Sequence, residues 1–210
     1  MRLDHISYAA GQEGLAAAVQ RMGALLGATF RDGGLHPRFG TRNFVLPLAG
    51  GVYLEVVAAL EHPASDKAPF GRAVKARSEL GGGWLAWVVA VDDIGPVERR
   101  LGRTAVLGHR IRPDGVELAW RQIGVLDLLD DPALPFFVQW ESPTSQHPSE
   151  GADLLPRIAE VEICGSRTEV VTWLGEPVDK GDVAVSWVDG QDAGLVAVQF
   201  YTGHGPVRVD

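Results

Sequence analysis

The stretch Leu3-Asp4-His5-Ile6-Ser7-Tyr8-Ala9 decides how the rest of the chain is interpreted. It is typical of a strand, and a histidine stands in its middle. A second predicted strand, Gly51-Val52-Tyr53-Leu54-Glu55-Val56-Val57, carries a glutamate in its middle. An ionisable group among apolar strand neighbours costs free energy unless another group pairs with it. We therefore expect His5 and Glu55 to share one polar site inside a sheet.

The composition is that of an ordinary globular protein. The chain has 210 residues, of which 46% are hydrophobic and 22% charged, enough for one or two hydrophobic cores. The net charge of −8 argues against a nucleic-acid partner, since phosphate binding needs clustered Lys and Arg. No apolar run reaches the length of a membrane span, and no secretory signal is evident. A single cysteine, Cys164, excludes an internal disulfide and fits a reducing, cytoplasmic location.

Three amphipathic segments predicted to be helices indicate an internal repeat. They end in the dipeptides Leu26-Gly27, Leu101-Gly102 and Leu174-Gly175, and glycine just after a helix is a C-cap signal. Each predicted helix follows an apolar strand and precedes two or three strand-like runs. The sequence thus predicts an α+β fold of repeated βαβββ units, with a third βαββ(β) unit over residues 154–210. The alternative is a generic α+β domain in which this spacing is accidental. The segments 59–80 and 142–154, rich in Pro, Ser, Glu and Lys, are predicted to be linkers.

Four stretches carry a resemblance to a known family: Leu3-Asp4-His5-Ile6, His36-Pro37-Arg38-Phe39-Gly40-Thr41-Arg42-Asn43, Val52-Tyr53-Leu54-Glu55 and Pro135-Phe136-Phe137-Val138-Gln139-Trp140. With them the chain resembles the glyoxalase-like domain proteins of the vicinal oxygen chelate superfamily. This superfamily includes glyoxalase I, extradiol dioxygenases and bleomycin resistance proteins. The resemblance covers residues 1–142 and implies a domain of two paired units, whose curved, half-open sheet forms a cup. Residues 154–210 would then pack on this domain or on a partner chain, as in a homodimer.

The resemblance also implies where a metal would bind. In metal-dependent relatives the cup holds a divalent cation, ligated from the first and fourth strands of both units. Here His5 and Glu55 fill the positions of the first unit, whereas Ala86 takes the second histidine position and Gln139 the second glutamate position. Glu141 lies two residues further along, on the same side of the strand. The candidate ligands for Zn, Mn, Ni or Fe are therefore His5, Glu55, Gln139 and Glu141. Because alanine cannot ligate a metal, we expect any metal to be absent or weakly bound.

A polar run next to a predicted strand supplies candidate substrate contacts. Arg38, Thr41 and Asn43 would line the mouth of the cup, with Arg38 as the contact for an anion. The same residues are ordinary turn formers, so the sequence leaves both roles open. Trp120 would stack on a flat ligand, although burial in the core explains it more simply. Gln139 would contact the substrate if it does not hold a metal.

The resemblance implies an enzyme of the lyase, isomerase or dioxygenase type that acts on a small oxygenated metabolite. Its catalytic residues would be His5 and Glu55, with Glu55 as a metal ligand or a base. The competing hypothesis is a metal-free protein that binds or sequesters a small molecule, where the two residues contact the ligand or form a structural pair. The retained His5 and Glu55 favour the enzyme, and Ala86 favours the binding protein. The incomplete ligand set argues against glyoxalase I activity itself.

Overall fold

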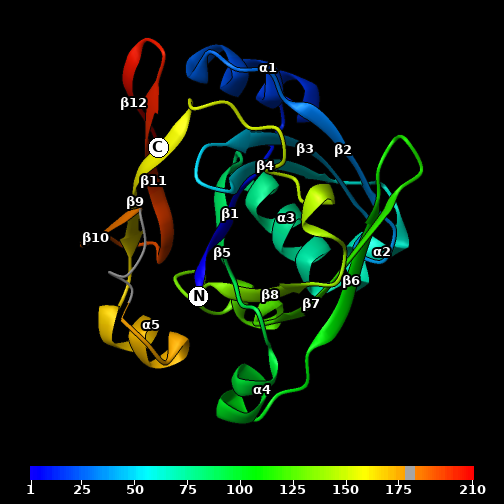
Figure 1. The fold of residues 1–210 in the computed structure, drawn as a ribbon, viewed down its shortest axis with the longest axis vertical. Helices are drawn as coiled ribbons and strands as arrows, with labels where there is room; N and C mark the ends of the chain where they lie inside the picture. The colour runs from blue at the N-terminus through cyan, green and yellow to red at the C-terminus, as the bar shows by residue number, and fades with distance from the viewer. Residues whose placement is uncertain (178–182) are drawn as a thin grey trace.

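The computed structural model describes residues 1–177 and 183–210 and confirms the α+β class. Eight strands form a barrel, and a second sheet of four strands stands beside it (Figure 1). The first unit consists of β1 (Arg2–Ala9), α1 (Leu15–Leu26), β2 (Arg31–His36), β3 (Thr41–Leu48) and β4 (Val52–Ala59). The second consists of β5 (Gly83–Ala90), α4 (Gly95–Leu101), β6 (Val106–Ile111), β7 (Glu117–Ile123) and β8 (Phe136–Trp140).

The two units join through their first strands. β1 pairs antiparallel with β5, and in each unit the first strand pairs in parallel with the fourth. The order around the barrel is β1-β4-β3-β2-β6-β7-β8-β5. The predicted half-open cup is in fact closed, because Leu35 of β2 pairs with Ile111 of β6. This seam rests on one residue pair.

Alternation along the strands decides which side chains enter the barrel. His5, Tyr53 and Glu55 line its interior. Their neighbours Ile6 and Leu54 belong to a different core, which packs outside the barrel against α1 and the second sheet. Both faces of β1 and β4 are therefore buried, which explains why β4 is nearly continuous in apolar residues.

The predicted linker 59–80 is instead mostly helical, with α2 (Pro63–Lys67) and α3 (Pro69–Glu79). Pro63 and Pro69 open these helices, where the missing backbone N–H costs nothing. Phe70, Ala73 and Val74 recur at helical spacing, are buried, and belong to the core inside the barrel. α3 therefore covers one end of the barrel, as Figure 1 shows.

The third unit repeats the order of elements but not their arrangement. It contains β9 (Arg157–Cys164), α5 (Arg167–Leu174), β10 (Ala184–Val188), β11 (Gly194–Thr202) and β12 (Gly205–Val209). Its sheet has the order β10-β9-β11-β12, so the strand after the helix lies directly beside the first strand. In the first two units that strand lies farthest from the first one.

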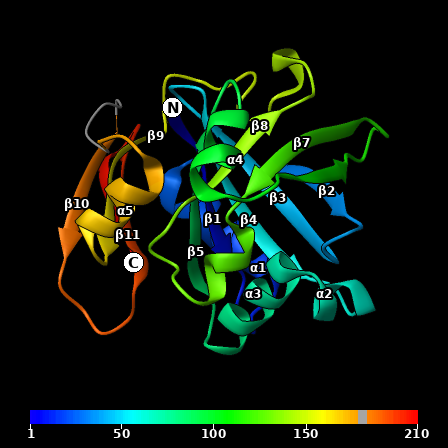
Figure 2. The ribbon, with the colours of Figure 1, turned by 90° about the horizontal axis from the view of Figure 1, so that it is seen from below.

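The second sheet packs on the outer face of the barrel (Figure 2). The indole Nε1 of Trp84 donates a hydrogen bond to the backbone oxygen of Val209 at 3.0 Å, and the ring of Phe200 stacks on Trp84. The two sheets thus share one hydrophobic core. The division into a domain of residues 1–142 and a separate unit of 154–210 stays a prediction.

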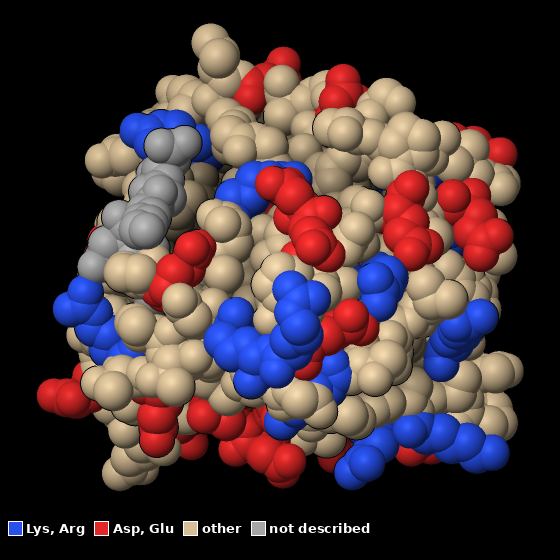
Figure 3. Space-filling view, turned by 60° about the horizontal axis from the view of Figure 1, so that its bottom comes forward, with Lys and Arg blue, Asp and Glu red and all other residues tan. Residues whose placement is uncertain are grey.

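Two short 3-10 helices, η1 (Val125–Leu129) and η2 (Thr144–Gln146), complete the described elements. η2 lies in the segment 142–154, the other segment that was predicted to be a linker. Among the described residues, no helix is long and apolar enough to cross a membrane. On the face shown in Figure 3, basic and acidic side chains are interspersed.

Candidate active site

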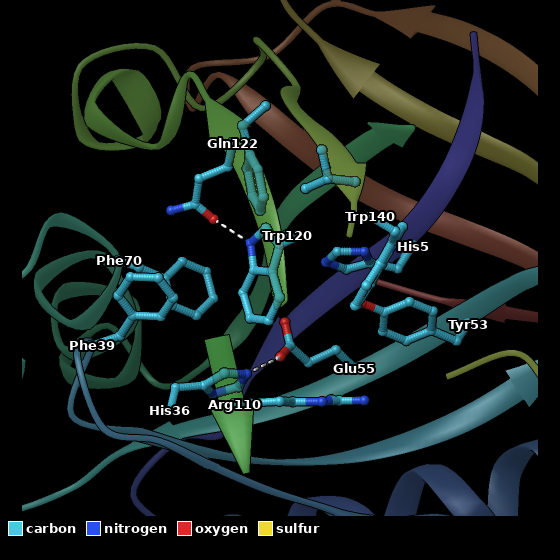
Figure 4. A pocket seen from close by; sticks show the side chains of 12 residues that line it. His5, His36, Phe39, Tyr53, Glu55, Phe70, Arg110, Trp120, Gln122 and Trp140 are labelled. Atoms are coloured by element: carbon cyan, nitrogen blue, oxygen red, sulfur yellow. Dashed lines mark hydrogen bonds and ion pairs between the residues drawn. The ribbon is translucent and has the colours of Figure 1, made fainter. Parts of the chain in front are cut away.

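One cavity inside the barrel collects the two residues on which the sequence prediction depends (Figure 4). Its ionisable lining residues are His5, His36, Tyr53, Glu55 and Arg110. Its remaining walls are mostly aromatic, formed by Phe39, Phe70, Trp120, Phe136 and Trp140 together with Val138 and Gln122. The cavity is small: its volume is about 30 Å³, which is room for about two water molecules. Ionisable groups in so small and apolar a space act strongly on one another.

His5 is held by a buried carboxylate from its own strand. A register shift in β1 between Leu3 and His5 lets Asp4 turn toward the same side as His5. Asp4 is fully buried, and its Oδ2 lies 2.8 Å from Nδ1 of His5. Because an ionised carboxylate only accepts hydrogen bonds, Nδ1 of His5 carries a hydrogen. In neutral His5 the other nitrogen, Nε2, then keeps its lone pair.

Two further donors complete the shell of Asp4. Its Oδ1 accepts hydrogen bonds from Nε1 of Trp140 and Nε2 of His147, each at 3.1 Å. Burial by itself would raise the pKa of Asp4, but the hydrogen bonds from His147 and His5 outweigh it and hold the pKa well below its usual value. Asp4 is therefore ionised at neutral pH and fixes the orientation of the His5 ring through Nδ1.

Glu55 is also buried and ionised. Its Oε2 accepts a hydrogen bond from the hydroxyl of Ser7, and its Oε1 accepts one from Nδ2 of Asn43, both at 2.6 Å. Burial would raise the pKa of Glu55, but the nearby His5 and His36 and the two hydrogen bonds together lower it. The site therefore holds a desolvated carboxylate that can still take up a proton.

His36 and His5 lie on opposite sides of Glu55 (Figure 4). Its Nε2 lies 4.0 Å from Oε1 of Glu55, and its Nδ1 lies 3.0 Å from the hydroxyl of Thr41. Burial lowers the pKa of His36 to about 4, more than the attraction of Glu55 can offset. His36 is therefore neutral at pH 7.

Arg110 brings a buried positive charge to the same cavity. Its side chain belongs to β6 and is 3% exposed as a residue, and its Nε has no hydrogen-bond partner among the described residues. Burial lowers the pKa of Arg110, but a guanidinium remains charged. Gly33 makes room for this arrangement, since a Cβ there would come within 2.1 Å of Oδ1 of Asn43 and 3.1 Å of Nη1 of Arg110.

The predicted substrate contacts fall into two groups. Trp120 lines the cavity, and its Nε1 donates to Oε1 of Gln122 at 2.6 Å. Thr41 and Asn43 are fully buried, but they support His36 and Glu55 rather than line the mouth. Arg38 is exposed in a turn and lies outside the cavity lining, so the buried guanidinium of this site is that of Arg110 instead.

Neither predicted ligand from the second unit reaches the cavity. Oε1 of Gln139 accepts a hydrogen bond from the backbone N–H of Ile94 at 2.8 Å, because Gln139 faces away from its neighbours Val138 and Trp140. Glu141 follows the end of β8 and is exposed. Their roles as metal ligands or substrate contacts are not supported by this geometry.

Strand register identifies the position that truly corresponds to Glu55. The resemblance takes Ala86 as the counterpart of His5, and Ser7, two residues after His5, then corresponds to Val88. Ser7 pairs with Glu55, whereas Val88 pairs with Phe136. The second glutamate position is therefore occupied by Phe136, three residues before Gln139. The resemblance placed Gln139 at this position because β8 is short and its sequence does not mark its register.

The donor set does not fit a metal ion like that of the metal-dependent relatives. Both second-unit positions are apolar, and Arg110 places a positive charge in the cavity. Within residues 1–177 and 183–210, no group of three His, Cys, Asp or Glu side chains could hold a metal ion. The remaining pair, His5 and Glu55, has its Nδ1 and both carboxylate oxygens engaged by other side chains.

Sequence reasoning missed Asp4, Tyr53, Arg110 and His147 as parts of the site. Tyr53 could have been found, since it lies two residues from Glu55 on the same strand face, and its ring stacks on His5 at 4.4 Å. His147 lies in the segment 142–154, which was predicted to be a linker, but it is buried against Asp4. Nothing in the local pattern around Arg110 distinguishes it from a surface arginine.

Comparison with known proteins agrees with this fold. The family model of the glyoxalase-like domain matches residues 3–178. A search of curated proteins finds no match. A hypothetical protein from Staphylococcus aureus is similar in structure, with a TM-score of 0.66 and 18% identity over 92% of this chain and 88% of that chain. A methylmalonyl-CoA epimerase from Mycobacterium tuberculosis has a TM-score of 0.45 and 16% identity over 68% of this chain and 89% of its own. One from Streptomyces coelicolor has a TM-score of 0.45 and 18% identity over 68% and 99%. The chain therefore belongs to the glyoxalase-like domain family of the vicinal oxygen chelate superfamily.

Proposed function

We propose that this protein is an enzyme that transfers a proton at a carbon next to a carbonyl group in a small oxygenated metabolite. One observation carries the proposal: ionised Glu55, which can accept a proton, and His5, which can carry and donate one, line one small cavity from neighbouring strands. Proton transfer between carbon positions, or between the two faces of one carbon, needs an acceptor and a donor placed around the same substrate. The reaction would be of the isomerase or lyase type.

In this scheme Glu55 takes the proton from carbon, and the electron pair of the C–H bond moves onto the carbonyl oxygen. Protonated His5, stabilised by the ionised carboxylate of Asp4, then returns a proton to the intermediate. Exchange of protons with water restores the starting state of both groups. The scheme needs no redox step.

Tyr53 is placed to stabilise the negative oxygen of the intermediate. Burial raises the pKa of Tyr53 well above 10, with nearby Asp4 and Glu55 adding to the effect. Its hydroxyl therefore stays protonated and can donate a hydrogen bond at neutral pH. In Figure 4 this hydroxyl points toward the space between His5 and Glu55. A fixed donor in a site with little water stabilises developing charge more than solvent would.

The aromatic walls favour a second candidate function, that of a binding protein without turnover. The rings of Trp120 and Trp140 lie 5.4 Å apart, and Phe39 and Phe70 pack at the other side of the cavity. Flat apolar walls of this kind suit an aromatic ligand. His5 and Glu55 would then only contact the ligand.

Deuterium exchange separates the two functions. The wild-type protein is incubated in D₂O with 2-oxo acids, 3-oxo acids and their thioesters, and loss of the C–H signal is followed by proton NMR. We expect exchange in at least one compound, slowed at least about 100-fold in Glu55→Gln, which is the usual contribution of a general base. Arg38→Ala is the matched control and should exchange like wild type, because Arg38 lies outside the cavity lining.

Equal exchange rates in wild type and Glu55→Gln would contradict the proposal. Absence of exchange in every compound, together with tight binding of a flat aromatic compound, would establish the binding function instead.

A further inference from the structure

Arg110 lies between the barrel cavity and a second hollow that opens at the surface. It is the residue that lines both. The outer hollow has a volume of about 250 Å³, and its lining includes two acidic residues, Asp32 and Glu150, besides Arg31 and Arg112. It adjoins the seam where a single residue pair joins β2 to β6. A small molecule could therefore reach Arg110 from either side.

The positive charge of Arg110 is not matched by a bonded partner. Among the described residues, no ion pair within 4.0 Å includes Arg110, and its Nε donates no hydrogen bond. Glu55, the carboxylate that lines the same cavity, already accepts hydrogen bonds from Ser7 and Asn43 on both of its oxygens. A buried guanidinium without a hydrogen-bonded partner is strongly disfavoured, so its retention needs an explanation.

The other arginines around the outer hollow are already engaged. Arg31 donates to the backbone oxygens of Glu150 and Gly151. Arg112 pairs with Asp114 on the surface. Of the arginines that line this hollow in the described part of the chain, Arg110 is the one without a hydrogen-bonded or ion-pair partner.

We infer that Arg110 binds the carboxylate of a small organic acid with one negative charge. The guanidinium fork matches two carboxylate oxygens, and a buried site strengthens such a bond. A single negative charge is favoured because ionised Glu55 lies in the same cavity and would repel a second one. The inference rests on the proposed function, since the carboxylate would belong to the substrate of that cavity.

Thermal unfolding of the full chain tests this inference with acetate, benzoate, benzamide and inorganic phosphate as probes. A ligand that binds the folded state raises the Tm as its concentration increases. We expect benzoate or acetate to raise the Tm of the wild-type protein, and benzamide, which lacks the charge, to leave it unchanged. Phosphate should raise it less than the carboxylates do.

Two variants locate the effect. Arg110→Met keeps the apolar stem of the side chain, removes the guanidinium and breaks no hydrogen bond or ion pair among the described residues, so it should fold. The rise with benzoate and acetate should disappear. Arg112→Met, also at the outer hollow, should respond like wild type. The inference is overturned if neither carboxylate raises the Tm, if benzamide or phosphate acts as strongly, or if Arg110→Met responds like wild type.

This test is independent of turnover. If carboxylates bind through Arg110 while Glu55→Gln exchanges deuterium like wild type, the anion site stands and the proton-transfer proposal fails. If Glu55→Gln loses exchange while no carboxylate binds, the reverse holds.

Discussion

The first two βαβββ units share one fold but contribute different chemistry to the cavity between them. The first supplies the groups that hold or donate protons: His5, His36, Tyr53 and Glu55. The second supplies one cation, Arg110, and walls such as Trp120, Phe136 and Val138. With Ala86 taken as the counterpart of His5, strand register makes Phe136 the counterpart of Glu55. The two units therefore do not form a symmetric site. The first unit supplies the groups that can transfer protons, and the second supplies Arg110 and apolar walls.

The largest expected effect comes from breaking the support of His5 in the first unit. Asp4→Asn removes a fully buried charge that accepts hydrogen bonds from His5, Trp140 and His147. We expect a loss of about 3–5 kcal/mol in the free energy of unfolding, as when a buried charge pair is broken. Denaturant unfolding measures it, and Asp153→Asn, at an exposed position, serves as control. Equal midpoints for both variants would mean that Asp4 does not organise the site.

His36 should make stability depend on pH. In the folded state its pKa is lowered to about 4 by burial, whereas the unfolded chain has the ordinary value of 6.5. Between these values the unfolded chain binds a proton that the folded protein does not, so stability falls as pH decreases from 6.5 to 4. The full loss is about 3 kcal/mol. Unfolding free energies of wild type and His36→Gln at pH 7 and pH 4.5 test this, and an equally steep loss in the variant would refute it.

The difference between the units can also be reversed. The double variant Ala86→His with Phe136→Glu would place ligand side chains at both matched positions of the second unit. If those two positions decide metal binding, Ni or Zn should raise the stability of the double variant by about 2.7 kcal/mol at one hundred times its Kd. The wild type should gain much less. A wild-type response as large as that of the variant would show that the asymmetry of the units does not control metal binding.

The smallest effect is expected on the outer side of β8. Gln139→Leu removes the acceptor for the backbone N–H of Ile94, next to the start of α4. This should cost about 1 kcal/mol of stability, as for the loss of a helix cap. Deuterium exchange should be unchanged, because Gln139 faces away from the cavity. Loss of deuterium exchange in a variant that still folds would show that Gln139 takes part in the reaction.

The sequence predicted the fold and the centre of the site because both depend on local patterns. The repeated dipeptides and strand alternation were sufficient for the α+β class, and His5 and Glu55 stood out as ionisable groups in apolar strands. The position of Gln139 could not be predicted, because register between β5 and β8 depends on pairing rather than on spacing. Arg110 and His147 could not be recognised either, since their burial results from segments distant in the sequence.

The central claim is that Glu55 and His5 move a proton without help from a metal ion. Deuterium exchange by the protein after thorough chelation tests it most directly, with the wild type and Glu55→Gln measured in parallel on the compound that exchanges best. We expect the wild type to keep its full rate after chelation and Glu55→Gln to stay at least about 100-fold slower. A wild-type rate that falls to the level of Glu55→Gln on chelation, and recovers when a divalent metal is added, would contradict it.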